Sequence, residues 1–180
     1  LEDPYELILS LFKKGVIKQS VLEVPGKDFV ILPLYSLRES KKNKKVVAKK
    51  SGLNQWNAGG RERDVGEVYI PIPTQIHKNF PNFLPSRDKS FNLFVPTGEI
   101  LSAKVCQENS KALMTNPNNA LSDWLLRKVL KLKEWQLLTY ERLKLLGVDS
   151  VRLVKMDNNN FKIDFAKIDS YDNFQIFFIV

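Results

Sequence analysis

Two strand-like segments near the end of the chain pair most simply as a β-hairpin. Residues 149–156 (DSVRLVKM) and 161–168 (FKIDFAKI) flank the polar turn 157–160 (DNNN), which is the pattern of two short antiparallel strands. Phe161, Ile163 and Phe165 alternate with polar residues and are predicted to share one buried face. This segment therefore favours antiparallel β structure.

Other strand-like runs and turn signals extend the same pattern. Residues 91–95 and 99–107 flank Pro96-Thr97-Gly98, which predicts a second hairpin. Short helices are predicted at 74–80, from Ser122 to about Leu132, and at 140–146 with Gly147 ending the last. The aromatic run 174–180 is predicted to be either a buried strand or simply the end of an excised piece. The remaining predicted strands are 29–36 and 67–73.

The segments add up to about seven strands, with two polar excursions at 38–66 and 107–121. We predict a mainly β domain with small α-helices, folded as an antiparallel, partly open barrel. A length of 180 residues suits one domain or one domain with an appendage. Residues 4–14 have the spacing of a short helix, but we expect 1–28 to be a linker or a remnant of a preceding domain. The main domain is then 29–180, and a first residue of Leu rather than Met is consistent with a processed or excised piece.

Composition argues against several classes of protein. The single cysteine, Cys106, cannot form an internal disulfide and indicates a reducing compartment such as the cytoplasm. No apolar run approaches a membrane span and no signal peptide is evident. The lone histidine, His77, cannot supply a paired-histidine mechanism, and no Cys/His spacing suits zinc. We therefore predict no catalytic site, no metal and no cofactor.

The positive charge is concentrated in one segment. The chain has a net charge of +8, of which residues 38–63 contribute +7, with nine basic and two acidic residues. A field of this kind favours a polyanionic partner.

The first excursion combines this charge with side chains that read bases. Arg suits guanine, and Asn or Gln suits adenine, in the major groove of DNA, while glycines at 52, 59 and 60 allow close approach to a ligand. We predict DNA contacts from Lys49, Lys50, Asn54, Gln55, Trp56, Asn57, Arg61 and Arg63.

The second excursion has similar chemistry. Amide and basic side chains dominate it, and its methionine could touch a thymine methyl group. The predicted DNA contacts here are Lys104, Gln107, Asn109, Lys111, Met114, Thr115, Asn116, Asn118 and Asn119. Two such arms projecting from one barrel would grip a duplex from both sides of a groove.

Two alternatives stay open. Asp28, Glu39 and Lys41 loosely imitate the acid-acid-lysine set of Mg²⁺-dependent nucleases, which would make the chain a self-contained nuclease. The other alternative is a barrel that binds RNA or protein through a basic loop.

Several segments, in order, resemble the C-terminal domain of the BfiI/NgoFVII-type restriction endonucleases over residues 29–175. They are SGLNQWN (51–57), GRERD (60–64), EVYIPIP (67–73), AKVCQ (103–107), KALMTNPN (111–118), LSDWLLR (121–127), YERL (140–143), GVDSV (147–151) and IDFA (163–166).

The resemblance implies a B3-like fold, a seven-stranded pseudobarrel with an N-terminal and a C-terminal arm that enter the major groove. It implies sequence-specific recognition of double-stranded DNA by the target-recognition domain of a type II restriction endonuclease, in a bacterial-type restriction–modification system. Cleavage is then expected from a separate N-terminal phospholipase-D-like nuclease domain, which acts without a metal ion and whose His-Lys-Asp motif this chain lacks.

Overall fold

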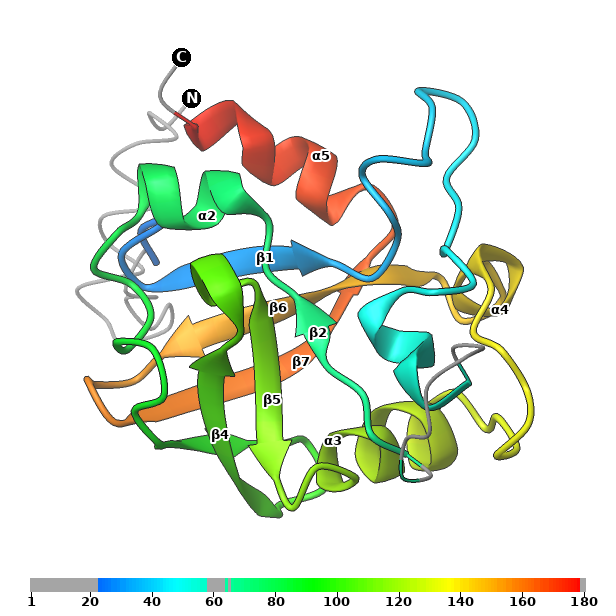
Figure 1. Ribbon diagram of the computed structural model, residues 1–180. Coiled ribbons are helices and arrows are strands. Elements are labelled where there is room, and N and C mark those ends of the chain that lie inside the picture. The colour runs from blue at the N-terminus through cyan, green and yellow to red at the C-terminus, as the bar shows by residue number, and fades with distance from the viewer. Residues whose placement is uncertain (1–22, 58–63, 65, 179–180) are drawn as a thin grey trace, which may run out of the picture.

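A sheet of seven strands curls into a nearly closed barrel (Figure 1). The computed structural model describes residues 23–57, 64 and 66–178 of the 180-residue chain. The strands are β1 (Phe29–Pro33), β2 (Ile70–Pro71), β3 (Phe91–Phe94), β4 (Ile100–Cys106), β5 (Ala112–Asn116), β6 (Val148–Lys155) and β7 (Asn160–Lys167).

The strands lie in the order β1-β6-β7-β3-β4-β5-β2. Neighbours pair antiparallel except β3 and β7, which are parallel. The edge strands β1 and β2 approach each other, so the curled sheet comes close to closing on itself. The long connection between these two edges, residues 34–69, therefore leaves the barrel at its seam.

Alternating apolar residues fill the barrel. Val151 and Leu153 of β6 face inward with Phe161 and Ile163 of β7, and all four are buried. The ring of Phe161 lies 4.9 Å from that of Phe91 on β3, centroid to centroid. This apolar core fixes the register of the hairpin, because a shift by one residue would turn its buried face to solvent.

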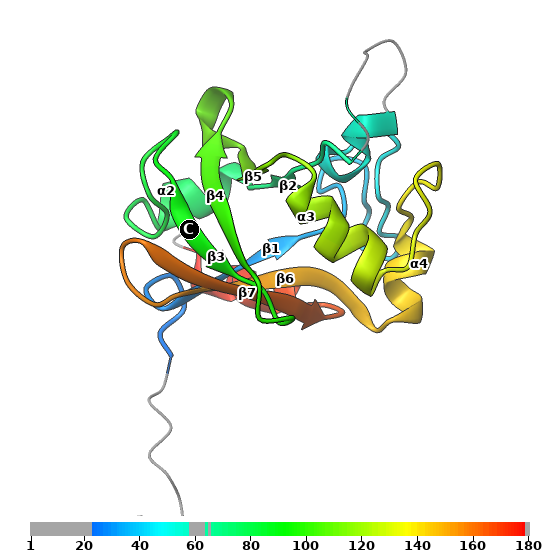
Figure 2. The ribbon, with the colours of Figure 1, turned by 90° about the horizontal axis from the view of Figure 1, so that it is seen from below.

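Helices cover the open ends and the side of the barrel (Figures 1 and 2). α2 (Thr74–Asn79) and α5 (Ser170–Phe174) lie at one end, where the Phe80 and Phe174 ring centroids are 5.7 Å apart. α3 (Ala120–Ser122) lies at the other end and continues into the π-helix η3 (Asp123–Val129), while α4 (Tyr140–Leu145) flanks the barrel. Short 3-10 helices are η1 (Gly52–Asn57), η2 (Glu108–Ser110) and η4 (Gln175–Phe177).

Most of the predicted elements are confirmed. Both hairpins form at the predicted turns. Thr139 caps α4, since its hydroxyl accepts a hydrogen bond from the Arg142 amide, and Gly147 follows the helix with a φ of +69°. Cys106 is buried, as expected for a small residue at a strand position.

Three predictions are wrong. The second excursion contains β5, because pairing with β4 on one side and β2 on the other holds a polar segment extended. Residues 174–178 form the end of α5 and η4 rather than a strand. Ser122 caps no helix, since its hydroxyl donates to the Asn119 carbonyl. The predicted helix at 4–14 lies outside the described residues. Among the residues that are described, no helix is long and apolar enough to cross a membrane.

Candidate nucleic-acid interface

Two tips project on the same side of the barrel. One is η1, in the connection between β1 and β2 that we call the first arm (residues 34–69). The other is the end of the β4–β5 hairpin with η2, which we call the second arm (residues 104–111). In Figures 1 and 2 the short strand β2 lies between them. A long ligand lying across β2 would contact both arms.

η1 is held in place by a buried asparagine. Asn54 is fully buried, and its amide nitrogen donates to the carbonyls of Ala48 and Leu138, each at 3.2 Å. Its amide oxygen accepts from the Leu138 N–H at 2.9 Å. Backbone groups therefore already use both ends of the Asn54 amide that was predicted to read a base.

The glycine before it packs against protein rather than a ligand. The Tyr69 N–H donates to the Gly52 carbonyl at 3.0 Å, and a Cβ at Gly52 would lie 2.4 Å from the Tyr69 ring. Only glycine allows this close approach of η1 to the segment leading into β2.

The remaining base-reading candidates of the first arm stay predictions. The backbones of Gln55, Trp56 and Asn57 form the last part of η1. Arg61 and Arg63 lie outside the described residues, as do Gly59 and Gly60.

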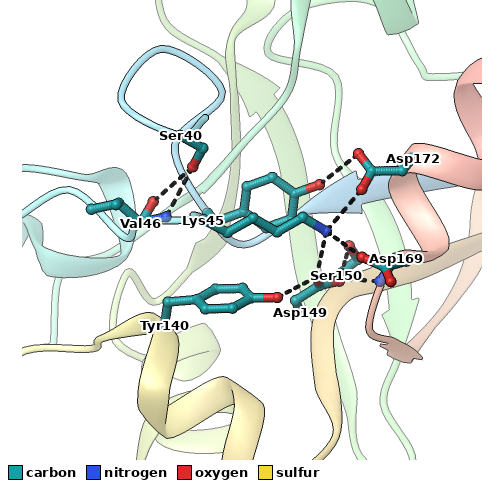
Figure 3. A network of polar contacts seen from close by, with 9 residues as sticks. Ser40, Lys45, Val46, Tyr140, Asp149, Ser150, Asp169 and Asp172 are labelled. Atoms are coloured by element: carbon teal, nitrogen blue, oxygen red, sulfur yellow. Dashed lines mark hydrogen bonds and ion pairs between the residues drawn. The ribbon is translucent and has the colours of Figure 1, made fainter. Parts of the chain in front are cut away.

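Lys45 anchors the base of the first arm rather than attracting DNA (Figure 3). Its ammonium nitrogen lies 3.0 Å from a carboxylate oxygen of Asp149, 2.8 Å from Asp169 and 2.9 Å from Asp172. The Tyr140 hydroxyl donates to the buried Asp149 at 3.0 Å. These contacts join the arm to β6, α4 and α5, so Lys45 has a structural role within the basic segment 38–63.

Charge and burial reinforce this anchor. Burial opposes the charge on Lys45, but hydrogen bonds to Asp169, Asp172 and Asp149 outweigh it and raise the pKa of the ammonium. Burial, with the hydrogen bond to Asp149, raises the pKa of Tyr140 to about 12. Lys45 therefore stays protonated throughout the neutral range.

Exposed lysines continue toward η1. Lys49 and Lys50 are exposed and line a hollow of about 600 Å³ together with Lys44 and the segment 137–141. The basic run predicted to attract a polyanion thus reaches the foot of the first arm.

The second arm carries polar side chains on a tightly turned backbone. Gln107, Asn109 and Ser110 have φ values of 68°, 59° and 53°, a left-handed conformation uncommon for non-glycine residues. The His77 ring nitrogen Nε2 lies 2.7 Å from the Ser110 carbonyl, so α2 braces the tip. Asn109 and Lys111 are exposed there, whereas Gln107 and Lys104 are half-buried.

The rest of the second predicted set lies in β5 and in the turn that follows it. Thr115 is buried, its hydroxyl donating to the Pro117 carbonyl at 3.1 Å and accepting from the Leu121 N–H at 3.0 Å. The Thr115 hydroxyl, predicted to contact a base, thus donates and accepts within the domain. Met114 is half-buried in β5, and Asn116, Asn118 and Asn119 are exposed around the turn before α3.

The matching family has the same architecture. The family model of the NgoFVII C-terminal B3-like DNA-binding domain matches residues 29–157, more than half of the chain. The chain belongs to this family. No curated protein sequence matches this chain. The B3-like pseudobarrel predicted from the sequence is thereby confirmed, and so is DNA as the partner of this restriction-enzyme domain.

The residues of the alternative nuclease are not brought together in this B3-like domain. Asp28 precedes β1 and accepts a hydrogen bond from the Val24 N–H, whereas Glu39 lies beyond the opposite end of β1. The five-residue strand, which spans roughly 16 Å, therefore lies between these two residues along the chain. Among residues 23–57, 64 and 66–178, no group of three or more His, Cys, Asp or Glu side chains could hold a metal.

Two features of the B3-like domain were not predicted from the sequence. The Lys45 anchor draws on Asp149, Asp169 and Asp172, which lie more than a hundred residues away in sequence. Trp135, in the coil between η3 and α4, is exposed. The one sequence signal for an exposed Trp135 was its position among polar residues in KEWQ (133–136).

Proposed function

We propose that this B3-like domain recognises a specific sequence in double-stranded DNA by placing its two arms in the major groove. The observation that carries the proposal is the projection of η1 and η2 on one side of the barrel, across β2 from each other (Figure 2). The major groove admits protein elements of this size and displays a distinct pattern of donors and acceptors for each base pair.

The side chains divide into two groups in this proposal. Lys49 and Lys50 contact phosphates and supply long-range attraction, because they are exposed at the foot of the first arm. Base readers are the arm residues whose amide, guanidinium or ammonium groups can make more than one hydrogen bond to a base edge, with Trp56 and Met114 packing beside them. They are Gln55, Asn57, Arg61 and Arg63 from the first arm and Lys104, Gln107, Asn109 and Lys111 from the second.

The turn before α3 adds an outer contact. Asn116, Asn118 and Asn119 are exposed there, and amides in this position suit phosphate or sugar oxygens at the edge of the recognised site.

Cleavage belongs to another part of the enzyme in this proposal. The resemblance to restriction endonucleases implies an N-terminal phospholipase-D-like nuclease domain, connected through residues 1–28, while residues 29–180 supply recognition. Incubation of the 180-residue chain with duplex DNA and Mg²⁺ tests this division. Cutting by the chain alone would contradict it.

Selection of bound duplexes from a random pool tests the recognition itself. We expect one enriched motif. Replacing guanine or adenine within that motif by its 7-deaza analogue removes a major-groove acceptor and should weaken binding at the positions that are read. Enrichment of no motif would leave only a non-specific basic surface. Sensitivity confined to minor-groove substitutions would contradict the proposed groove.

A further inference from the structure

Trp135 presents a large apolar surface to solvent. Its side chain is 70% exposed, whereas Trp124 in the neighbouring η3 is 1% exposed. Indole rings are usually largely buried, and exposed aromatic surface commonly marks a binding site. Trp135 lies in the coil 131–138 between η3 and α4, which we call the tryptophan turn.

The tryptophan turn is held in one conformation. Leu132 is buried, and the Gln136 N–H donates to the Lys133 carbonyl at 3.0 Å while the Gln136 side chain accepts from the Lys133 N–H at 2.9 Å. The Arg127 guanidinium donates to the carbonyls of Leu132 and Lys133 at 3.3 and 3.4 Å. A contact made by Trp135 would therefore require little ordering of the backbone, which favours binding.

The buried amide of Asn54 connects this turn to the first arm. It accepts from the Leu138 N–H and donates to the Leu138 carbonyl, so the end of the tryptophan turn and η1 are joined by two hydrogen bonds. These bonds fix the position of η1 relative to the turn, so a ligand positioned by the first arm is also positioned relative to the turn.

The surroundings of Trp135 continue the candidate interface. Trp135 lines a hollow of about 570 Å³ with Gly66 of the first arm and Asn119 of the turn before α3. On the other flank, Leu137 and Leu138 share a hollow with Lys49 and Lys50. In Figure 2 the yellow coil between α3 and α4 rises on the same side as the two arms.

We infer that the tryptophan turn is a third DNA-contacting element, in which the Trp135 indole packs against deoxyribose and base edges of nucleotides flanking those read by the arms. The inference rests on the proposed function. The charged residues that line this hollow balance, Arg127 and Lys133 against Asp123 and Glu134, and Lys133 Nζ lies 5.7 Å from the centroid of the Trp135 ring. We therefore assign the contact to the indole surface rather than to a net charge. It differs in this from the phosphate contacts of Lys49 and Lys50.

The first test is binding of the 180-residue chain to its selected duplex. We expect Trp135→Ala to raise Kd about tenfold, the effect of burying roughly half an indole face, and to leave the salt dependence of binding unchanged. The Kd of Trp135→Phe should lie between that of the wild type and that of Trp135→Ala. Ile100→Ala is the matched control, because Ile100 is also exposed but lies at the end of β4 remote from the second arm, and it should bind like the wild type.

The second test is fluorescence in a Trp56→Phe background, at duplex concentrations that titration shows to saturate this variant, because Trp56 is itself a proposed DNA contact. The chain has three tryptophans, so the remaining emission comes from buried Trp124 and exposed Trp135. Saturating duplex should protect the exposed indole from acrylamide quenching. If the wild type binds its duplex while Trp135→Ala binds equally well and quenching is unchanged, the inference is overturned and the exposed indole belongs to a protein partner. If the wild type binds no duplex, the proposed function itself fails.

Discussion

At the scale of the residue, the same side chain chemistry serves recognition and architecture. Asn54 was a candidate base reader because its amide offers a donor and an acceptor, and the structure uses both on the backbone of Ala48 and Leu138. Thr115 likewise joins β5 to the turn before α3. Sequence alone could not separate the two uses, since burial decides between them and burial depends on the whole fold.

Asn54→Ala should destabilise the domain. Loss of the amide leaves one N–H and two carbonyls without their partner in a buried site, and each such group costs roughly 1–3 kcal/mol. We expect a lower urea midpoint with an unchanged m-value, and a parallel loss of DNA affinity. Normal stability with relaxed base preference would instead indicate a direct base contact.

Lys49→Gln with Lys50→Gln should reduce the salt dependence of DNA binding. Removing one lysine that neutralises a phosphate lowers the slope of log K against log [salt] by about 0.9, and we expect affinity to fall equally on cognate and random duplexes. Lys167→Gln, at an exposed position of β7, is the control. It removes one positive charge, as each of the two substitutions in the first arm does. An unchanged slope in the salt titration would remove both lysines from the interface.

At the scale of the element, the two arms are supported differently. The first arm depends on side chains, the Lys45 ion pairs and the Asn54 amide. The second arm is a hairpin extension whose tip is braced by His77. Hairpins with clear turn residues could be predicted, because their signals are local. β5 could not, because its extended form comes from pairing with β4 and β2.

Aromatic residues near the C-terminus show the same limit of local signals. Phe174 and Phe178 favour strands by propensity, yet they pack with Phe80 as part of a helical cover on the barrel. Tertiary packing overrides a weak intrinsic preference of this kind.

His77→Ala should weaken DNA binding while the fold persists. The hydrogen bond to the Ser110 carbonyl is half-exposed and supports only the second arm. One net hydrogen bond of about 0.5–1.5 kcal/mol corresponds to roughly a 2- to 12-fold rise in Kd. Titration of a fluorescent duplex measures the effect, with thermal unfolding alongside. A large fall in Tm without a change in Kd would limit His77 to a role in stability.

At the scale of the whole molecule, the sequence predicted a candidate binding region but not how its side chains are used. The charge count and the amide-rich excursions selected the two candidate arms, because both are properties of sequence. The Lys45 anchor was not predictable, since it joins a lysine-rich run to carboxylates distant in the chain. Because Lys45 pairs with these carboxylates, one of the nine basic residues counted in segment 38–63 is used within the domain.

Alkaline pH should unfold the domain in a window set by this anchor. The folded pKa of Tyr140, about 12, exceeds its ordinary value of 10.0, and the pKa of Lys45 is raised as well. The folded state therefore retains protons that the unfolded chain releases, so its stability is intact below about pH 10 and falls as pH rises toward 12. Tyr140→Phe should flatten this fall in urea titrations at each pH. An identical pH profile would show that the tyrosine is not coupled to folding.

The same anchor imposes an order on biosynthesis. Lys45 is made early, but its carboxylate partners Asp169 and Asp172 are among the last residues of this chain to be translated. β1 can pair only after β6 has been made, because β6 is its only strand partner within the described part of the chain. A nascent chain on the ribosome thus cannot form these two ion pairs until residues 169–172 have emerged from the exit tunnel. The first arm, which we propose to bind DNA, therefore gains its full anchor late in synthesis.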